Sequence, residues 1–286
     1  VIIFFYTIYV YAQFEGGGKI LHQTFKIDPT FGILVSALIT IVYSAAGGCT
    51  AVVWTDACQS ILMIITFVLV PIIAFYHVCN QGLSISLALE SAGPEMNSWL
   101  GTQAGLEIGL LAAGLFILNR LSWMFGYFGG QPPLSTRWMA MKDDKEVKKG
   151  TYVALIWTIL AYSGAIMIGF CALTLYGKGA VKDPEEILPF MLVKMMPAWL
   201  TGLLLTGAIA AMMSTASSQL LVISSSITED ILHKALKKNI SDRNLVIISK
   251  IVLLTIGLVA LTLALSFGKP IFSIVSWAWA GIGCSF

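Results

Sequence analysis

Residues 60–76 read SILMIITFVLVPIIAFY, an apolar run without one charged side chain. A helix needs about 20 predominantly apolar residues to cross the hydrocarbon core of a bilayer, and flanking residues such as Trp54 extend this run. A transmembrane β-strand would instead alternate apolar and polar side chains over about ten residues. Because the run is uniformly apolar, it predicts a membrane-spanning helix.

Similar runs recur along the rest of the chain and predict further spans. They are Val1–Phe14, Phe31–Ala46, Ile108–Gly130, Thr151–Tyr176, Leu200–Ile227, Leu245–Phe267 and a last run starting at Ile271. Charged residues make up only 11% of the 286 residues, whereas soluble domains carry about a quarter. The sequence therefore predicts an all-α, multi-span membrane helix bundle. Both ends fall inside apolar runs, so we expect a piece of a bundle that is truncated at both ends.

The loops differ in charge, which predicts their orientation. Basic residues gather after the fourth and sixth spans, at Arg137, Lys142, Lys145, Lys148, Lys149, Lys234, Lys237, Lys238 and Arg243. Basic loops stay in the cytoplasm, so the loops after the fourth and sixth spans are predicted to be internal. If each run crosses the membrane once, residues 16–30 are expected to form an external loop and residues 47–56 an internal turn. The predicted location is the cell (inner or plasma) membrane, with a short external amphipathic helix at 184–197.

Several function classes lack support in the sequence. The net charge is +2, and no basic stripe of the kind that neutralises many phosphates is present, which argues against a nucleic-acid partner. No phosphate-binding, nucleophile or zinc signature appears, so we expect neither an enzyme nor a cofactor. Nothing implies an obligate protein partner. The lipid bilayer is the expected environment.

The fourth span carries a break. Gly126, Gly129 and Gly130 lead into Gln131-Pro132-Pro133, and proline removes a backbone donor and clashes with the preceding turn. Broken membrane helices are tolerated where they line a protein cavity, and in transporters they bind solute and ions. A simple kink, or a helix end at the cytoplasmic surface before Arg137, is the other interpretation. Gln131 would then satisfy the freed backbone.

Hydroxyl groups are stacked in the sixth span, which reads AAMMSTASSQ over 210–219. Ser214, Thr215 and the Ala211 carbonyl would offer an oxygen-only shell, and oxygen ligands suit a hard cation. The alternative is that each hydroxyl bonds a carbonyl one turn back in its own helix.

Two ionisable residues lie most clearly in apolar surroundings, and a third starts a span. Glu15 and Arg120 are predicted at similar depth, so we expect either an ion pair at the external mouth or two side chains that reach the interface independently. Asp56 starts the third predicted span, as a helix cap or as a carboxylate on an ion path.

Together these stretches resemble the sodium/solute symporter family, and most of all its proline-transporting members. The likeness includes Phe5–Tyr9, Ala51–Asp56, Gly126–Pro132, Ala210–Thr215, Gln219–Val222, Ile227–Asp230 and Val275–Gly281. It implies the LeuT-type fold of two inverted five-helix repeats. Residues 1–286 would form a single transmembrane transporter domain, partial, with core helices three to nine and the start of ten.

The resemblance also implies a site. Sodium would bind at Ala211, Ser214 and Thr215, with Asp56 on its path, and the solute would bind at Tyr9, Trp123, Tyr127 and Pro132, with Gln131 beside them. An extra glycine before Gln131, and Glu15 and Arg120 at positions that are apolar in the proline-transporting members, depart from the pattern. The absent first core helix would complete both sites.

The leading hypothesis is sodium-coupled symport of a small organic solute such as proline, with Na+ as the coupling ion. A transporter-like membrane sensor, or a symporter of another small carboxylate or a sugar, is the alternative. A channel is disfavoured, because the chain shows no repeated filter loop or acidic ring.

Overall fold

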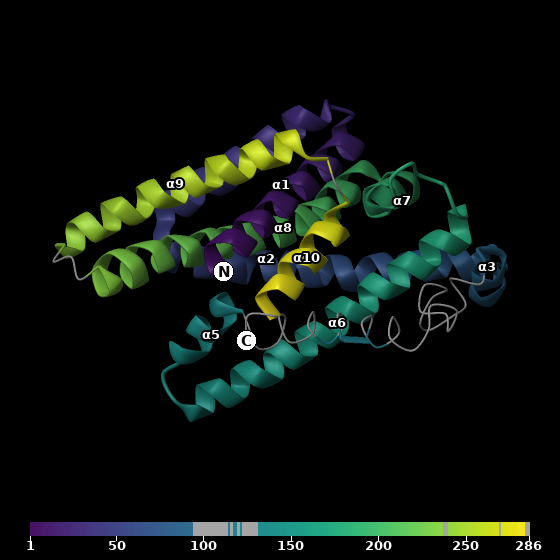
Figure 1. Ribbon diagram of the computed structural model, residues 1–286. Coiled ribbons are helices and arrows are strands. Elements are labelled where there is room, and N and C mark those ends of the chain that lie inside the picture. The colour runs from purple at the N-terminus through teal and green to yellow at the C-terminus, as the bar shows by residue number, and fades with distance from the viewer. Residues whose placement is uncertain are drawn as a thin grey trace. The chain divides into compact units, whose positions relative to one another are not determined.

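The computed structural model describes residues 1–93, 114, 117–118, 121, 131–236, 240–268 and 270–283, apart from the side chains of 49, 51 and 136. All regular elements among them are helical (Figure 1). They are α1 (Ile2–Phe25), α2 (Pro29–Asn80), α3 (Ile85–Ser91), α5 (Pro132–Met139), α6 (Asp144–Tyr176), the 3-10 turn η3 (Pro184–Glu186), α7 (Ile187–Met195), α8 (Ala198–Ser225), the π-helical segment η4 (Ser226–Ala235), α9 (Asp242–Ser266) and α10 (Ile271–Gly283).

The described part of the chain contains five helical segments that are long and apolar enough to cross a membrane. They are Pro29–Gly48, Val52–Asn80, Asp144–Tyr176, Ala198–Ala235 and Asp242–Ser266. The prediction of an all-α, multi-span bundle is confirmed. The span predicted at 108–130 lies mostly outside the described residues, and the short external helix expected at 184–197 corresponds to η3 and α7.

Helix α1 runs past the point where the sequence predicts a loop. The interval 16–30 was expected to be external loop, but α1 continues to Phe25 and only Lys26–Asp28 separate it from α2. Glycine weakens an isolated helix, yet here it permits close packing. A Cβ atom at Gly17 would lie 2.1 Å from Ser36 Oγ, so the tight contact with α2 stabilises the helical path through the glycines.

The turn predicted at 47–56 is also much shorter than expected. Within α2 only Gly48 leaves helical geometry, with φ 62° and ψ −165°. This combination of a positive φ with an extended ψ is essentially confined to glycine. The helix resumes at once, so Asp56 lies inside the second span of α2 rather than in a turn.

The described residues form two compact units, which we treat separately. The first contains residues 1–60, 131–140 and 209–283, and the second contains 61–93, 114, 117–118, 121 and 141–208, with the gaps given above. Helices α2 and α8 contribute to both. Whether residues 1–286 act as a single transporter domain stays a prediction.

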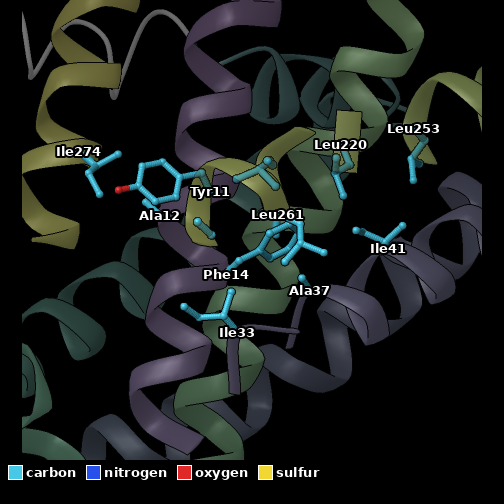
Figure 2. Close-up of a cluster of buried hydrophobic side chains, with 14 residues drawn as sticks. Tyr11, Ala12, Phe14, Ile33, Ala37, Ile41, Leu220, Leu253, Leu261 and Ile274 are labelled. Carbon is cyan, nitrogen blue, oxygen red and sulfur yellow. The ribbon is translucent and has the colours of Figure 1, made fainter. Parts of the chain in front are cut away.

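The core of the first unit surrounds α1, which packs against α9 and α10. Figure 2 shows Tyr11 and Phe14 of α1 within the buried cluster. The Tyr11 hydroxyl also donates a hydrogen bond to the Phe267 carbonyl at the end of α9. Burial of each large apolar side chain is worth about 1.5–3 kcal/mol, so this cluster fixes α1 beside its neighbours.

In the second unit small residues bring helices close together. A Cβ at Gly164 of α6 would lie 2.0 Å from the Phe67 carbonyl oxygen, and one at Gly207 of α8 would lie 2.2 Å from Thr66 Oγ1. Thr66 Oγ1 lies 2.9 Å from the Leu204 carbonyl and donates to it. Small residues at helix contacts, supplemented by hydroxyl hydrogen bonds, are typical of packing inside membranes.

Candidate functional site

The candidate ion site is built around Asp56, whose side chain is 12% exposed. The carboxylate accepts a hydrogen bond from Ser218 Oγ of α8, at 3.0 Å to Oδ2. The cap interpretation of Asp56 is therefore wrong. The helix resumes directly after Gly48, so the backbone N–H groups around Asp56 are not the free donors of a first turn. Its side chain joins α2 to α8 instead.

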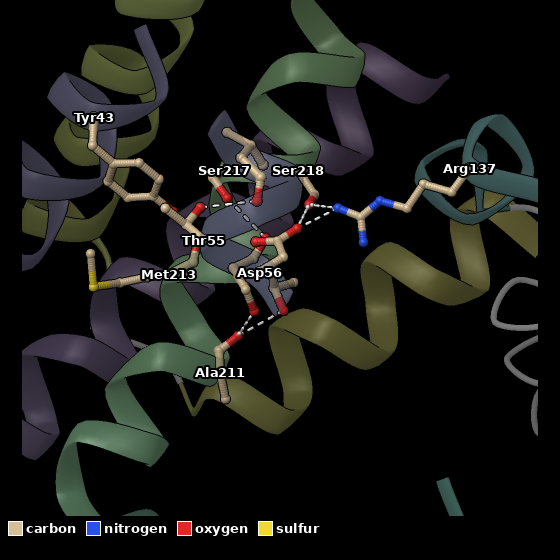
Figure 3. A network of polar contacts seen from close by, with 11 residues as sticks. Tyr43, Thr55, Asp56, Arg137, Ala211, Met213, Ser217 and Ser218 are labelled. Atoms are coloured by element: carbon tan, nitrogen blue, oxygen red, sulfur yellow. Dashed lines mark hydrogen bonds and ion pairs between the residues drawn. The ribbon is translucent and has the colours of Figure 1, made fainter. Parts of the chain in front are cut away.

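Arg137 of α5 completes this contact (Figure 3). Its Nη2 atom forms an ion pair with Asp56 Oδ2 and donates to Ser218 Oγ at 2.6 Å. The Arg137 side chain is 42% exposed, so the guanidinium reaches the buried carboxylate from the open side. From the sequence, Arg137 is recognisable only as a loop charge, and no pattern assigns a role to Ser218. The position of Arg137 just after the Gln131–Pro133 break was the available signal.

The second carboxylate oxygen of Asp56 makes no hydrogen bond within the described residues. This atom, Oδ1, is buried, and the same is true of Gln59 Oε1, about one turn further along α2. An unsatisfied buried polar atom costs about 1–3 kcal/mol, and more where the group is charged. These oxygens thus favour a bound cation or water at this position.

The hydroxyl stack of α8 is ordered as a ladder along its own backbone. Ser214 Oγ and Thr215 Oγ1 both donate to the Ala211 carbonyl, at 3.1 and 2.9 Å, and Ser217 Oγ donates to the Ser214 carbonyl at 3.0 Å. The oxygens of Ala211, Ser214 and Thr215 are thereby gathered in one small volume. Each hydroxyl oxygen keeps lone pairs that the internal bond does not use.

Tyr43 of α2 supports this ladder from the other side. Its hydroxyl donates to the Met213 carbonyl at 3.0 Å, and the ring lies beside the hydroxyl groups in Figure 3. This partly buried hydrogen bond helps to fix the backbone that carries Ser214. The donor set near Asp56 is composed of carboxylate, hydroxyl and carbonyl oxygens, which fits a hard cation such as Na+.

A small cleft opens next to the ion pair. Its volume is about 160 Å³, and Arg137, Ser218 and Pro133 are among the residues that line it, together with Val52, Val53, Ala140, Leu221 and Val222. The lining of the cleft is thus mostly apolar, apart from the Arg137 guanidinium and the Ser218 hydroxyl.

The residues predicted to bind the solute are only partly described. Tyr9 lies on α1, half-buried, and its ring meets Trp279 of α10 edge-on with 5.7 Å between centroids. Gln131 directly precedes α5, and Pro132 is the first residue of this helix. Proline is well tolerated at a first helical position, because the N–H group there has no partner within the helix. Trp123 and Tyr127 lie outside the described residues.

Only one member of the predicted external ion pair lies within the described residues. Glu15 lies in α1 and is buried, with 8% of its surface exposed, whereas Arg120 lies outside the described residues. A buried carboxylate inside a membrane helix is expensive unless it is paired or functional. The pairing of Glu15 with Arg120 stays a prediction.

The whole chain matches one protein family. The model of the sodium:solute symporter family covers residues 1–286, and the chain belongs to this family. It is therefore a multi-pass membrane protein of a transporter family and not an enzyme.

Known relatives agree with this assignment. The chain is 35% identical to the high-affinity proline transporter PutP of Bacillus subtilis, over 100% of this chain and 59% of that protein. It is 32% identical to the sodium/proline symporter of Escherichia coli, over 100% of this chain and 56% of that protein. The chain thus spans little more than half the length of these relatives.

A solved structure shows the fold. A Na+-coupled sialic acid symporter, described in a substrate-bound outward-open state with a novel Na+ site, superposes with a TM-score of 0.70 and 20% identity. The match covers 98% of this chain and 61% of that one. The predicted LeuT-type bundle is thereby confirmed as a fold.

Proposed function

We propose that this chain is part of a sodium-coupled symporter for a small organic solute, and that the solute is proline or a similar amino acid. The observation that carries the proposal is the buried Asp56 carboxylate, which faces the hydroxyl-rich segment of α8 in a member of a sodium-dependent family. The proline-transporting relatives support the choice of solute. Residues 1–286 would work as one transporter domain.

In this proposal sodium binds to the oxygens of Ala211, Ser214 and Thr215. Both hydroxyl oxygens already lie within 3.1 Å of the Ala211 carbonyl oxygen through their helix-internal bonds. Rotation of the two hydroxyl protons away from the ion would turn their lone pairs toward it. Neutral oxygens bind a monovalent cation weakly enough that it can leave again, which a transport cycle requires.

Asp56 would lie on the path by which sodium arrives or leaves. In the structure the Arg137 guanidinium forms an ion pair with Asp56 Oδ2. An ion at Asp56 and the guanidinium of Arg137 would compete for the same carboxylate, because both are cations. Arg137 would therefore neutralise the carboxylate whenever no sodium is present, which avoids an uncompensated charge in a low-dielectric region.

The solute would bind beside Tyr9, Trp123, Tyr127, Gln131 and Pro132. Aromatic rings would pack against its apolar part, and the backbone freed at the helix break would meet its charged ends. Glu15 and Arg120 would pair as an external gate. Coupling follows if sodium and solute both favour the same access state, since each then strengthens the binding of the other.

The test is uptake of labelled L-proline by proteoliposomes that contain the full-length protein, with and without an inward sodium gradient. Uptake that requires the gradient supports the proposal. Uptake that is independent of sodium contradicts the coupling, whereas sodium-driven uptake of a different solute contradicts only the choice of proline. Sodium-driven uptake of labelled sialic acid or of labelled sugars identifies that second case.

A further inference from the structure

We infer that Gln219 of α8 and Tyr6 of α1 recognise the charged ends of the solute, and that Trp279 of α10 forms one wall beside its apolar part. This inference rests on the proposed function and adds three residues that the predicted site does not contain. It starts from two buried polar atoms that have no hydrogen-bond partner within the described residues, Gln219 Oε1 and the Tyr6 hydroxyl.

Helices α1 and α8 run antiparallel and in close contact, which fixes their relative register. At one end a Cβ at Gly16 would lie 2.7 Å from Met212 Sδ. At the other end Tyr6 and Ile223 share one buried cluster. Gln219 follows Met212 by seven residues and Tyr9 precedes Gly16 by seven, so Gln219 lies at the level of Tyr9.

The same contacts show which way Gln219 faces. Positions 212, 219 and 223 are separated by seven and four residues, so they form one stripe along α8. Met212 and Ile223 of this stripe contact α1. Gln219 therefore points toward α1 as well, and only 4% of its surface is exposed.

Helix α10 brings Trp279 to the same level. The Tyr9 and Trp279 rings meet edge-on, and Ile282, about one turn further along α10, packs in one cluster with Tyr6. Three helices thus contribute to one layer that contains two aromatic rings, an amide oxygen and a phenol. Bulk water does not reach it, because Tyr6 and Trp279 are 1% and 5% exposed.

The chemistry of these groups matches an amino acid. The Gln219 amide oxygen is an acceptor and takes an N–H from an ammonium or imino group, whereas the Tyr6 hydroxyl donates to a carboxylate. The rings of Tyr9 and Trp279 pack against the apolar part between these ends. Tyr9 links the layer to the predicted solute site, of which it is a member.

The experiment compares solute analogues in proteoliposomes that contain the full-length protein at saturating sodium. Inhibition of labelled L-proline uptake is measured for L-proline, for pyrrolidine, which lacks the carboxylate, and for cyclopentanecarboxylate, which lacks the N–H group. In Tyr6→Phe we expect the preference for proline over pyrrolidine to fall about tenfold or more, because a hydrogen bond to a charged group is lost. The preference of Tyr6→Phe for proline over cyclopentanecarboxylate should stay unchanged.

Gln219→Met should show the reverse pattern, with a reduced preference over cyclopentanecarboxylate and an unchanged preference over pyrrolidine. Gln219→Glu retains an acceptor oxygen and adds a negative charge, so it should keep or increase the preference for proline over cyclopentanecarboxylate, which separates recognition from packing. Ser163→Ala on α6, an exposed position bonded to its own helix, is the control. Unchanged preferences in both Tyr6→Phe and Gln219→Met would mean that protein groups satisfy these atoms, and would overturn the inference. A wild-type protein without sodium-driven uptake would instead refute the proposed function.

Discussion

Ser218 Oγ lies 3.0 Å from Asp56 Oδ2 and ties α8 to α2 across 162 positions of sequence. The same serine accepts a hydrogen bond from Arg137, so one hydroxyl connects a carboxylate and a guanidinium from two other helices. A shared hydrogen-bond partner makes the three side chains interdependent. The contact therefore makes the charge on Asp56 and the position of α8 respond to each other.

Asp56→Asn should raise the sodium concentration for half-maximal uptake by about tenfold or more, equivalent to about 1.4 kcal/mol of binding free energy. The substitution keeps the side-chain size but removes the charge that attracts the ion. The measurement is sodium-dependent proline uptake in proteoliposomes. Cys58→Ala, two residues away and exposed, is the matched control. An Asp56→Asn variant with unaltered sodium dependence would exclude the carboxylate from the ion path.

Arg137→Gln should lower the sodium concentration for half-maximal uptake severalfold, because the competing cation at Asp56 is removed. Arg137→Lys should behave more like the wild type, since it keeps the charge but loses the planar fork of donors. Sodium activation curves of both variants test this. A higher sodium requirement in Arg137→Gln would show that the guanidinium supports ion binding rather than competing with it.

The double variant Ser214→Ala/Thr215→Ala should raise the sodium requirement far more than Cys171→Ala does. Ser214 and Thr215 supply the two hydroxyl groups that donate to the Ala211 carbonyl, whereas Cys171 is a buried thiol on α6. Sodium titration of uptake distinguishes the two. Equal effects would mean that the ladder only serves the backbone of α8.

The sequence predicts local features of this protein well, and long-range contacts poorly. Apolar runs identify the spans because a bilayer requires a minimum length, and the hydroxyl stack is visible because its members are adjacent. The Asp56–Arg137 ion pair joins positions 81 residues apart, which no periodicity encodes. In the sequence Gln219 stands out only as part of a motif, because burial without a hydrogen-bond partner is a property of the fold.

The path of α1 illustrates a different failure. Three successive glycines at 16–18 favour a loop by intrinsic propensity. In the structure the helix continues, because close contact with Ser36 and Ile33 of α2 requires residues without a Cβ. Tertiary packing here outweighs propensity, and only coordinates could reveal it.

Asp28→Asn should reduce the pH dependence of thermal stability on the acidic side. Asp28 lies between α1 and α2, and its Oδ1 accepts hydrogen bonds from the Thr30 and Phe31 N–H groups at 2.9 and 3.3 Å. Hydrogen bonds from the Thr30 side chain and the Phe31 backbone hold the pKa of this carboxylate below its ordinary value of 3.8. The stabilisation is thus present above that value and is lost as the pH falls through the lowered pKa.

The measurement is the melting temperature of the detergent-solubilised full-length protein between about pH 6 and pH 3. The wild type should be more stable than Asp28→Asn at the upper end, and the difference should shrink toward the lower end. A difference that grows with acidification would reverse the sign and refute the assignment.

Gly207→Ala should destabilise the protein by about 1–3 kcal/mol, the usual cost of overpacking. The new Cβ would lie 2.2 Å from Thr66 Oγ1 and 2.6 Å from the Leu62 carbonyl oxygen. Neither neighbour can retreat easily, because Thr66 Oγ1 is bonded to the carbonyls of Leu62 and Leu204. The helices would have to move apart, which would break the bond from Thr66 to α8.

Gly202→Ala is the matched control on the same helix. No described atom lies within 4 Å of a Cβ at Gly202, and alanine favours a helix over glycine by about 0.5–1 kcal/mol. Thermal unfolding in detergent should therefore place Gly207→Ala below the wild type and Gly202→Ala at or slightly above it. If both variants melt alike, α2 and α8 do not approach as closely as Thr66 and Leu204 indicate.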